Sequence, residues 1–404
     1  MRAYIGGTYF SVIFSTFHMP TGALVRIAVP KETAPGEHRA ALLPANVQRL
    51  VDKGVELQVE TGLGATIDVS DDQYKQAGAE VVTDRQALMS GAGIVLRVGH
   101  PTDEEIDWLQ KDTIHVSFLD PFTETDVIRK LAAQNVRTIS MEMLPRTTRA
   151  QKMDAISSQS NLAGYVTVIV AAERLDRVFP MMMTPAGTIT PSRVFVIGAG
   201  VAGLQAIATA KRLGARVEAM DTRPEAAEQI ESLNAKVVRI DLGKTESTKD
   251  GYAKALTDEQ LELQRQGTAK VCANSDVVIT TAKVFGRKAP LILTSDMVAG
   301  MRPGSVIVDM AVETGGNVEG SKLNEEVNVN GVRVVGLGNL PARVAYHASQ
   351  MYSGNLYAMI DEFWDEEAKV FNLDLEDEII QGCLITNAGQ VVNERVKAVL
   401  EDAS

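Results

Sequence analysis

Hydrophobic residues in this chain of 404 residues gather in short β-branched runs that alternate with stretches of helical periodicity. This alternation is typical of parallel sheets with helices on both faces, because strands buried on both sides are apolar throughout. In the N-terminal half of the chain the runs predict strands at residues 25–29, 55–60, 80–82, 94–98, 114–118 and 136–141. Helical stretches separate these strands, for example at 44–53 and 125–134.

The same rhythm begins again near residue 193 and predicts a second set of strands. We expect them at residues 193–197, 216–220, 237–240, 277–280, 305–309 and 332–336. Helical patterns at 154–175 and 346–364 are long enough to run between two lobes. The sequence therefore predicts an α/β fold of two doubly wound, Rossmann-like lobes, linked by long helices and separated by a cleft suited to a ligand.

The second long helix is expected to return the tail to the first lobe, which makes that lobe discontinuous. The predicted boundaries are 20–155 plus 346–404 for the first lobe and 156–345 for the second. Residues 1–19 fit neither lobe, since 9–17 are apolar and aromatic and only Arg2 precedes them. We interpret them as an extension with Met19 as a natural start, and N-terminal processing is the alternative.

A polar stretch at 242–266, punctuated by glycine, interrupts the alternation in the second half. It predicts a surface loop followed by a charged helix. Loops of this length within compact domains are often functional.

A glycine-rich segment follows the apolar run at 194–197 and precedes a helical stretch. It consists of Gly198, Ala199, Gly200, Val201, Ala202 and Gly203. In a strand–turn–helix setting the first glycine allows the tight turn, the second leaves room for a pyrophosphate, and the third lets the helix pack closely on the sheet. The free amides at the helix start, with the helix dipole, then favour an anion. The segment predicts a dinucleotide site.

The next strand ends at Asp221, which is followed by Thr222 and Arg223. A carboxylate at this position accepts hydrogen bonds from the adenosine ribose hydroxyls and repels a 2′-phosphate, so the motif predicts NAD(H). Arg223 could favour NADP, but we interpret it as a solvated charge or an adenine-side contact.

Loops at the carboxyl ends of later strands are expected to complete the site, since ligands of open α/β sheets bind there. The candidates are Thr281, Ala282, Glu313, Asn339 and Leu340. Ordinary turn chemistry is the alternative for each of them.

The composition narrows the function classes. A net charge of −12 with no basic cluster argues against a nucleic-acid partner. Cys272 and Cys383 have no paired spacing, so we expect neither a disulfide framework nor a metal site. No apolar stretch reaches the ~20 residues of a membrane span.

No residue stands out as the general acid or base that a self-contained dehydrogenase needs. None of the histidines lies in a setting that marks it as catalytic. They are His18, His38, His100, His115 and His347.

Several further segments are distinctive. They are Ile-Ala-Val-Pro-Lys-Glu at 27–32, Gly-Glu-His-Arg at 36–39, Pro-Arg-Thr-Thr-Arg-Ala-Gln-Lys-Met-Asp at 145–154, Ser-Ser-Gln-Ser-Asn-Leu-Ala-Gly-Tyr at 157–165, and the stretches 198–215, 221–225 and 304–309. On these segments the chain resembles the alanine dehydrogenase/pyridine nucleotide transhydrogenase family, and within it the NAD(H)-binding domain of proton-translocating transhydrogenases. The segments at 145–165 favour the transhydrogenase branch.

The resemblance implies further site residues. The family loop matching 146–157 reaches over the nicotinamide, so Arg146, Gln151, Asp154 and Ser157 are expected to bind or orient the dihydronicotinamide and its ribose, with Arg146 paired to Asp154. A capped helix start with a surface ion pair is the alternative. Tyr252 matches the tyrosine of a mobile loop that closes over the nucleotide.

In alanine dehydrogenases a basic pair holds the substrate carboxylate and a histidine transfers the proton. Here Arg39 could match one basic residue and Arg97 stands in place of a lysine, but residues 117–121 contain no histidine. A free-standing amino-acid dehydrogenase is therefore the second hypothesis, and an NAD-sensing protein without turnover is the third.

The resemblance also implies partners. We expect a homodimer that binds NADH or NAD⁺ and exchanges hydride with NADP held on a separate NADP(H)-binding domain, coupled to proton translocation by a transmembrane subunit. The expected location is cytoplasmic, peripheral on the inner face of the membrane. Because the chain ends without membrane helices, it resembles the separate-subunit form or a truncated product.

Overall fold

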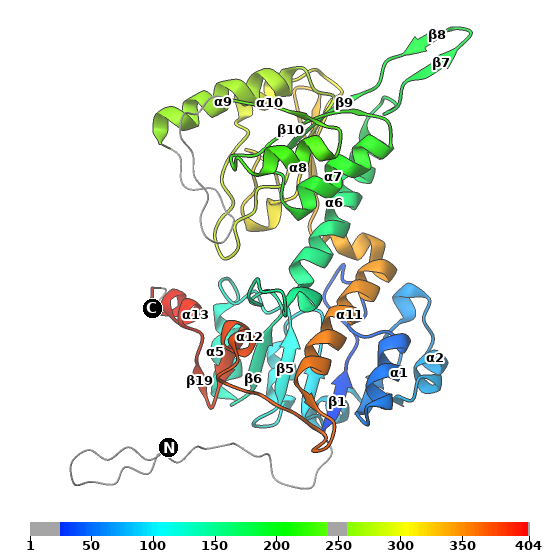
Figure 1. Ribbon diagram of the computed structural model, residues 1–404, viewed down its shortest axis with the longest axis vertical. Coiled ribbons are helices and arrows are strands. Elements are labelled where there is room, and N and C mark those ends of the chain that lie inside the picture. The colour runs from blue at the N-terminus through cyan, green and yellow to red at the C-terminus, as the bar shows by residue number, and fades with distance from the viewer. Residues whose placement is uncertain (1–24, 241–256, 403–404) are drawn as a thin grey trace, which may run out of the picture.

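The computed structural model describes residues 25–240 and 257–402. Figure 1 shows two α/β lobes joined by helices α6 (Ala155–Arg174) and α11 (Ala345–Phe363). The extension at 1–19 and the loop position Tyr252 lie outside the described residues. Within the described ranges, no helix combines the length and hydropathy that a bilayer span requires.

The first lobe is built on an eight-stranded sheet with the order β19-β18-β6-β5-β4-β1-β2-β3. Its strands are β1 (Arg26–Val29), β2 (Glu56–Glu60), β3 (Glu80–Val82), β4 (Ile94–Leu96), β5 (Ile114–Ser117), β6 (Arg137–Ser140), β18 (Leu384–Asn387) and β19 (Gln390–Val391). Strands β1 to β6 are parallel, whereas β18 pairs antiparallel with β6. Because β1 lies between β2 and β4, the strand order reverses there, which creates a topological switch point.

The helices of this lobe are α1 (Pro44–Asp52), α2 (Asp71–Gln76), α3 (Arg85–Ser90), α4 (Asp103–Trp108), α5 (Thr125–Ala133), α12 (Glu378–Cys383) and α13 (Glu394–Asp402). Two of them begin at capping boxes, in which Ser70 exchanges hydrogen bonds with Gln73 and Thr102 with Glu105. These caps satisfy amides that have no partner within the helix.

The second lobe has a seven-stranded sheet with the order β11-β10-β9-β12-β13-β15-β14. Its strands are β9 (Arg193–Ile197), β10 (Arg216–Met220), β11 (Lys236–Val237), β12 (Val277–Thr280), β13 (Val306–Asp309), β14 (Glu325–Val329) and β15 (Val332–Gly336). Strand β14 is antiparallel to β15, whereas the other pairs in the list are parallel. The switch point of this sheet lies between β9 and β12.

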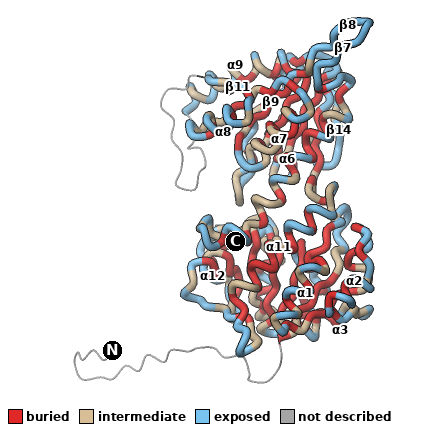
Figure 2. Tube along the Cα trace, turned by 45° about the vertical axis from the view of Figure 1, so that its right-hand side comes forward, coloured by how far each residue is buried: buried red, intermediate tan, exposed pale blue. Residues whose placement is uncertain are grey.

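Both faces of the second sheet are covered. Val194 and Val196 of β9 belong to a core shared with α6, α7 (Val201–Arg212) and α8 (Ala226–Ser232). Phe195 and Ile197 belong to a second core with α9 (Asp258–Ala273) and α10 (Ser295–Ala299). The red core on either side of the strands is visible in Figure 2. The prediction of two doubly wound α/β lobes is confirmed, while the boundaries assigned to them stay a prediction.

Several edge elements were not predicted. They are β14, β18, β19 and a hairpin of β7 (Met182–Thr184) and β8 (Gly187–Ile189), which projects from the second lobe in Figure 1. The strand predicted at 237–240 is wrong in its extent, since β11 covers only Lys236–Val237. Ile240 instead packs toward Gly267 of α9, where a Cβ would lie 2.6 Å from the Ile240 side chain.

The bridging helix α6 lies directly on α7. A Cβ built on Gly164 would come within 2.2 Å of the carbonyl oxygen of Ala202, so only glycine permits this approach. The start of α6 is fixed by Asp154, whose carboxylate accepts hydrogen bonds from the Ser157 amide at 2.9 Å and the Ser157 hydroxyl at 2.6 Å. The segment before α6 is thereby held relative to the second sheet.

We predict that Gly164→Ala lowers the free energy of unfolding by about 1–3 kcal/mol, because the added methyl group must push α6 away from α7. Gly354→Ala in α11 is the matched control, since a Cβ there meets nothing within 4 Å and alanine favours a helix interior by about 1 kcal/mol over glycine. Urea unfolding of both variants measures the difference. Equal stability of the two variants would contradict the close-packing role of Gly164.

Candidate functional site

The turn between β9 and α7 has the geometry that the glycine spacing predicts. Gly198 has a φ of 97°, and a Cβ on it would lie 2.5 Å from the hydroxyl oxygen of Thr281. A Cβ on Gly203 would lie 1.9 Å from the Gly198 carbonyl oxygen. By contrast, nothing lies within 4 Å of a Cβ on Gly200. Two glycines therefore permit the tight turn, and the third leaves space open above it.

The start of α7 offers backbone donors to that space. Gly200 is the N-cap residue and provides no side chain to cap the first turn, so the amides there are not bonded by their own N-cap. Together with the helix dipole, such amides favour an anion. The Ala199 amide is different, because it donates a 2.8 Å hydrogen bond to the carboxylate of Asp221.

Asp221 lies at the end of β10, and its two oxygens are both engaged. The Arg223 guanidinium donates 2.9 Å hydrogen bonds to each of them, and the Arg223 amide donates one at 2.8 Å. Burial would raise the pKa of Asp221, but the bonds from Arg223 and Ala199 outweigh it and lower that pKa. Asp221 is therefore charged at neutral pH.

The interpretation of Arg223 as a solvated charge is wrong. Its guanidinium folds back two residues along the chain onto Asp221 and forms an ion pair. This pairing spreads the negative charge and occupies the oxygens that a ribose would need. Asp221 and Arg223 therefore form one unit.

The loop after β12 closes the switch point of the second sheet. The Thr281 hydroxyl donates to the carbonyls of Ile197 and Gly198, at 3.2 and 3.1 Å. The Ala282 amide donates to the side chain of Asn317, and the Asn317 side chain donates back to the Ala282 carbonyl at 2.8 Å. Thr281 and Ala282 are thus brought to the fingerprint turn.

Asp309 organises the next loop without having been singled out from the sequence. It is fully buried and accepts hydrogen bonds from the Thr280 hydroxyl and from the amides of Ala311, Asn317 and Val318. A carboxylate at the end of an apolar strand is the sequence signal that could have identified this role.

Glu313 and Asn339 are brought together as well. Glu313 accepts a 2.9 Å hydrogen bond from the Asn339 amide and lies 3.6 Å from the Lys283 ammonium. The Asn339 side chain, however, turns toward the first lobe. Leu340 is buried in the core of the second lobe, so its side chain does not face a ligand.

The segment 146–157 precedes and begins α6. Arg146 and Gln151 are exposed, and Asp154 and Ser157 form the helix cap described above. Two neighbouring cations anchor the segment to the end of the first lobe: Arg149 pairs with Glu362 and Asp377, and Lys152 pairs with Glu362 at 2.7 Å. The sequence analysis did not identify these anchors.

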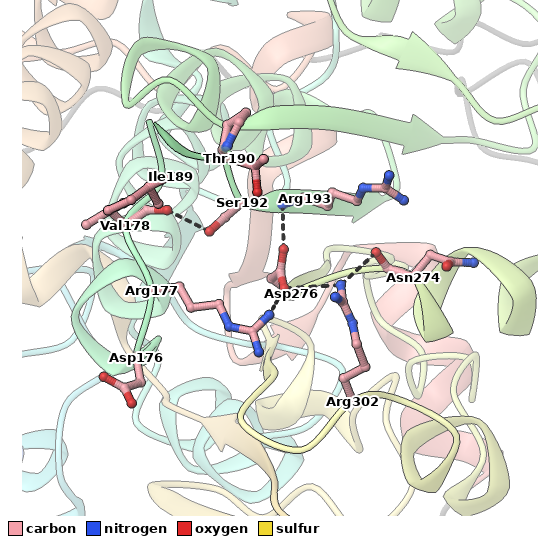
Figure 3. A pocket seen from close by; sticks show the side chains of 11 residues that line it. Asp176, Arg177, Val178, Ile189, Thr190, Ser192, Arg193, Asn274, Asp276 and Arg302 are labelled. Carbon is pink, nitrogen blue, oxygen red and sulfur yellow. Dashed lines mark hydrogen bonds and ion pairs between the residues drawn. The ribbon is translucent and has the colours of Figure 1, made fainter. Parts of the chain in front are cut away.

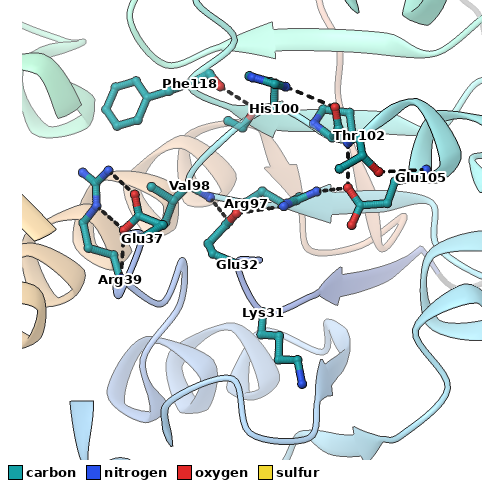
Figure 4. Close-up of polar contacts among 12 residues, drawn as sticks. Lys31, Glu32, Glu37, Arg39, Arg97, Val98, His100, Thr102, Glu105 and Phe118 are labelled. Carbon is teal, nitrogen blue, oxygen red and sulfur yellow. Dashed lines mark hydrogen bonds and ion pairs between the residues drawn. The ribbon is translucent and has the colours of Figure 1, made fainter. Parts of the chain in front are cut away.

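At the switch point of the first sheet, charges neutralise one another (Figure 4). Arg97 is 2% exposed and pairs with Glu32 at 2.8 Å and with Glu105 at 2.5 Å. Nearby His115 is fully buried, and burial lowers its pKa to about 3, so the imidazole is neutral. A buried arginine already held by two carboxylates is a poor receptor for a third.

A cavity of about 790 Å³ lies elsewhere, beside the base of the β7–β8 hairpin (Figure 3). Arg177 and Arg302 line it and pair with Asp276 at 2.6 and 3.1 Å. Asp276 also accepts from the amide of Arg193, the first residue of β9, so this cavity lies at the edge of the sheet opposite the fingerprint turn. Among residues 25–240 and 257–402, no cluster of three His, Cys, Asp or Glu side chains is arranged to hold a metal ion.

With this geometry described, comparison with known proteins places the chain in a family. Two family models match: alanine dehydrogenase/PNT, N-terminal domain, over residues 28–163, and alanine dehydrogenase/PNT, C-terminal domain, over residues 167–394. The chain therefore belongs to the alanine dehydrogenase/PNT family.

Within the family, transhydrogenase subunits are more similar to this chain than alanine dehydrogenases are. The chain is 42% identical to the first of the separate NAD(P) transhydrogenase alpha subunits of Rhodospirillum rubrum, over 91% of this chain and 98% of that protein. It is 39% identical to the protein of the same name in Rickettsia prowazekii, over 93% and 98%. Alanine dehydrogenase of Staphylococcus epidermidis is 29% identical, over 79% and 82%.

Solved structures agree. A transhydrogenase from Sinorhizobium meliloti matches with a TM-score of 0.82 and 41% identity, covering 91% of this chain and all of that one. An L-alanine dehydrogenase matches with a TM-score of 0.78 and 26% identity, covering 94% and 100%. The chain is thus homologous to the transhydrogenase alpha subunit and shares its fold with alanine dehydrogenase.

Proposed function

We propose that this chain binds NAD(H) at the carboxyl edge of its second sheet and exchanges hydride with NADP held on a partner domain. The observation that carries the proposal is the fingerprint turn, where Gly200 leaves open space in front of the first amides of α7 while Asp221 stands at the end of the next strand. The similarity to transhydrogenase subunits supports the same reaction.

The residues present fit a dinucleotide. The amides of Val201 and Ala202 bind the pyrophosphate in front of Gly200. Asp221 holds the adenosine ribose, which requires the Arg223 guanidinium to move off one of its oxygens, and Thr222 lies between them. The backbone of Thr281, Ala282, Asn339 and Leu340, with Glu313, borders the nucleotide on the far side of the turn.

The segment 146–157 serves the reactive end of the nucleotide. Arg146, Gln151, Asp154 and Ser157 bind or orient the nicotinamide and its ribose, and Tyr252 closes over them. The nucleotide supplies the hydride when bound. The chain's own residues hold the ring, keep water out and present the donor carbon, and direct transfer between two rings needs no proton-transfer residue.

Two observations disfavour amino-acid oxidation. Arg97 and Arg39, the two candidates for a carboxylate-binding pair, are both held by glutamates of the same lobe. His115 is fully buried and neutral. The first lobe therefore acts as a scaffold for the second.

The partners follow from the same reaction. We propose an NADP(H)-binding domain and a transmembrane subunit that couples transfer to proton translocation, with this chain peripheral on the cytoplasmic face. A homodimer is also proposed. The β7–β8 hairpin supports it, because Met181 and Met183 are 59% and 75% exposed on an arm that projects from the lobe, and exposed apolar arms commonly pack on another chain.

The central test is to mix the purified chain with NADH and an NADP⁺-loaded NADP(H)-binding domain and to follow hydride transfer optically. We predict transfer in the mixture and none when either protein is omitted. The chain alone with NAD⁺ and L-alanine is the control. Alanine oxidation by the chain alone, or no transfer in the mixture, would overturn the proposed function.

For the nucleotide specificity, we predict that Asp221→Ala weakens NADH binding by about 1–3 kcal/mol, because charge-assisted hydrogen bonds to the ribose are lost. Glu228→Ala on α8 removes an exposed carboxylate of the same charge and should leave NADH affinity unchanged. Calorimetric titration with NADH and NADPH gives both affinities. If Asp221→Ala binds NADH as the unmodified chain does, the ribose role of Asp221 is excluded.

For the dimer, light scattering should give the mass of two chains. Replacing Met182 and Met183 with aspartate should shift the mass to one chain, because the arm then carries charge into the interface. Leu291→Asp, at a residue of the same lobe that is 58% exposed, is the control and should remain dimeric. A single-chain mass for the unmodified protein would contradict the homodimer.

A further inference from the structure

One buried guanidinium joins segments from both lobes. Arg39 and Glu37 are each 9% exposed, and their side chains form a two-pronged ion pair at 2.8 and 2.6 Å in the loop after β1 (Figure 4). A buried ion pair is costly unless its remaining donors are also satisfied. The remaining donors of Arg39 reach beyond the loop.

The first of them reaches the bridging helices. The Arg39 guanidinium donates a 2.8 Å hydrogen bond to the side-chain oxygen of Gln159 on α6. The Gln159 amide nitrogen in turn donates to the carbonyl of Ala348 on α11 at 3.0 Å. Gln159 is itself buried, so both helices that run between the lobes are tied to Arg39.

The second reaches the other lobe. Arg39 donates at 3.2 Å to the side-chain oxygen of Asn339, while the Asn339 amide nitrogen donates at 3.0 Å to Glu37. An amide suits this place because it offers one acceptor to the cation and one donor to the anion. Asn339 belongs to the loop after β15, where its φ of 44° is a left-handed conformation that asparagine tolerates.

A second contact joins the lobes nearby. Phe122, after β5, meets Phe285, after β12, with ring centroids 5.3 Å apart and nearly perpendicular rings. Phe285 thereby packs against the core of the first lobe. The loops after β12 and β15, which border the proposed nucleotide site, are thus the same loops that contact the first lobe.

We infer that Arg39 is a positioning residue that fixes the angle between the lobes through Asn339 and Gln159. It does not touch the nucleotide. It holds the second lobe, with the fingerprint turn, at one orientation to the first, so that the donor ring meets a partner domain in a single geometry. The kinetic part of this inference rests on the proposed function, whereas the angular part does not.

The test uses interlobe distance. Cys272 and Cys383 are both buried, so spin labels attach selectively to cysteines placed at Lys75 of α2 and Lys236 of β11, which are 58% and 77% exposed. Pulsed electron resonance should give a narrow distance distribution in the unmodified background. Arg39→Lys keeps the charge but loses the planar fork of donors, and Asn339→Gly keeps the left-handed backbone but loses the side chain. Each should broaden the distribution.

Asn330→Gly is the matched control, because Asn330 has a φ of 51° in the exposed turn between β14 and β15, away from the first lobe. It should leave the distribution unchanged. The double variant of Arg39 and Asn339 should be no broader than the wider single variant, since both remove one contact. Unchanged distances in either Arg39→Lys or Asn339→Gly would overturn the inference.

Hydride transfer gives the second measurement. Arg39→Lys should slow transfer to the NADP(H)-binding domain about tenfold, as expected for a misplaced donor, with NADH affinity within twofold. A parallel loss of NADH affinity with undisturbed distances would place Arg39 in the nucleotide site instead. If the unmodified chain transfers no hydride, the proposed function fails, and the distance measurement still decides the positioning role.

Discussion

Helix α6 can lie on α7 only because residue 164 has no side chain, and this contact relates the two halves of the proposed site. A Cβ at Gly164 would meet the Ala202 carbonyl at 2.2 Å, and Ala202 is two residues beyond Gly200. Ser157 lies seven residues before Gly164 on the same helix, which corresponds to about 10 Å along its axis. The segment at 146–157 and the fingerprint turn are therefore rigidly connected, although the first follows the sheet of one lobe and the second belongs to the sheet of the other.

The sequence predicted the interior of both sheets and missed their edges, for a physical reason. Strands such as β9 and β12 are buried on both faces, so they are apolar throughout and stand out in the sequence. Every residue of β7 and β8 is exposed, and β14 is a polar edge strand. Burial leaves little trace in such strands, and their pairing depends on the strand beside them.

The candidate site divides in the same way. The turn at Gly198, Gly200 and Gly203 depends on neighbours within six residues, so spacing alone could predict its geometry. Partners brought together by the fold could not be predicted: Arg39 and Gln159 are 120 positions apart, and Arg39 and Asn339 are 300 apart. The pairing of Arg223 with Asp221 is local, yet the sequence analysis missed it, because a charge two residues beyond a strand is also compatible with a solvated side chain.

Both lobes have a doubly wound sheet with a switch point, yet the two switch points differ in what they offer a ligand. In the first lobe, Arg97 is buried between Glu32 and Glu105, and a ligand carboxylate would have to displace a glutamate. Leaving one partner of such a pair unpaired costs several kcal/mol, by the usual range of about 3–5 kcal/mol for buried pairs. In the second lobe the donors are amides at the start of α7, which no N-cap side chain occupies. The same topology thus supports a scaffold in one half and a nucleotide site in the other, and the difference lies in a few buried charges.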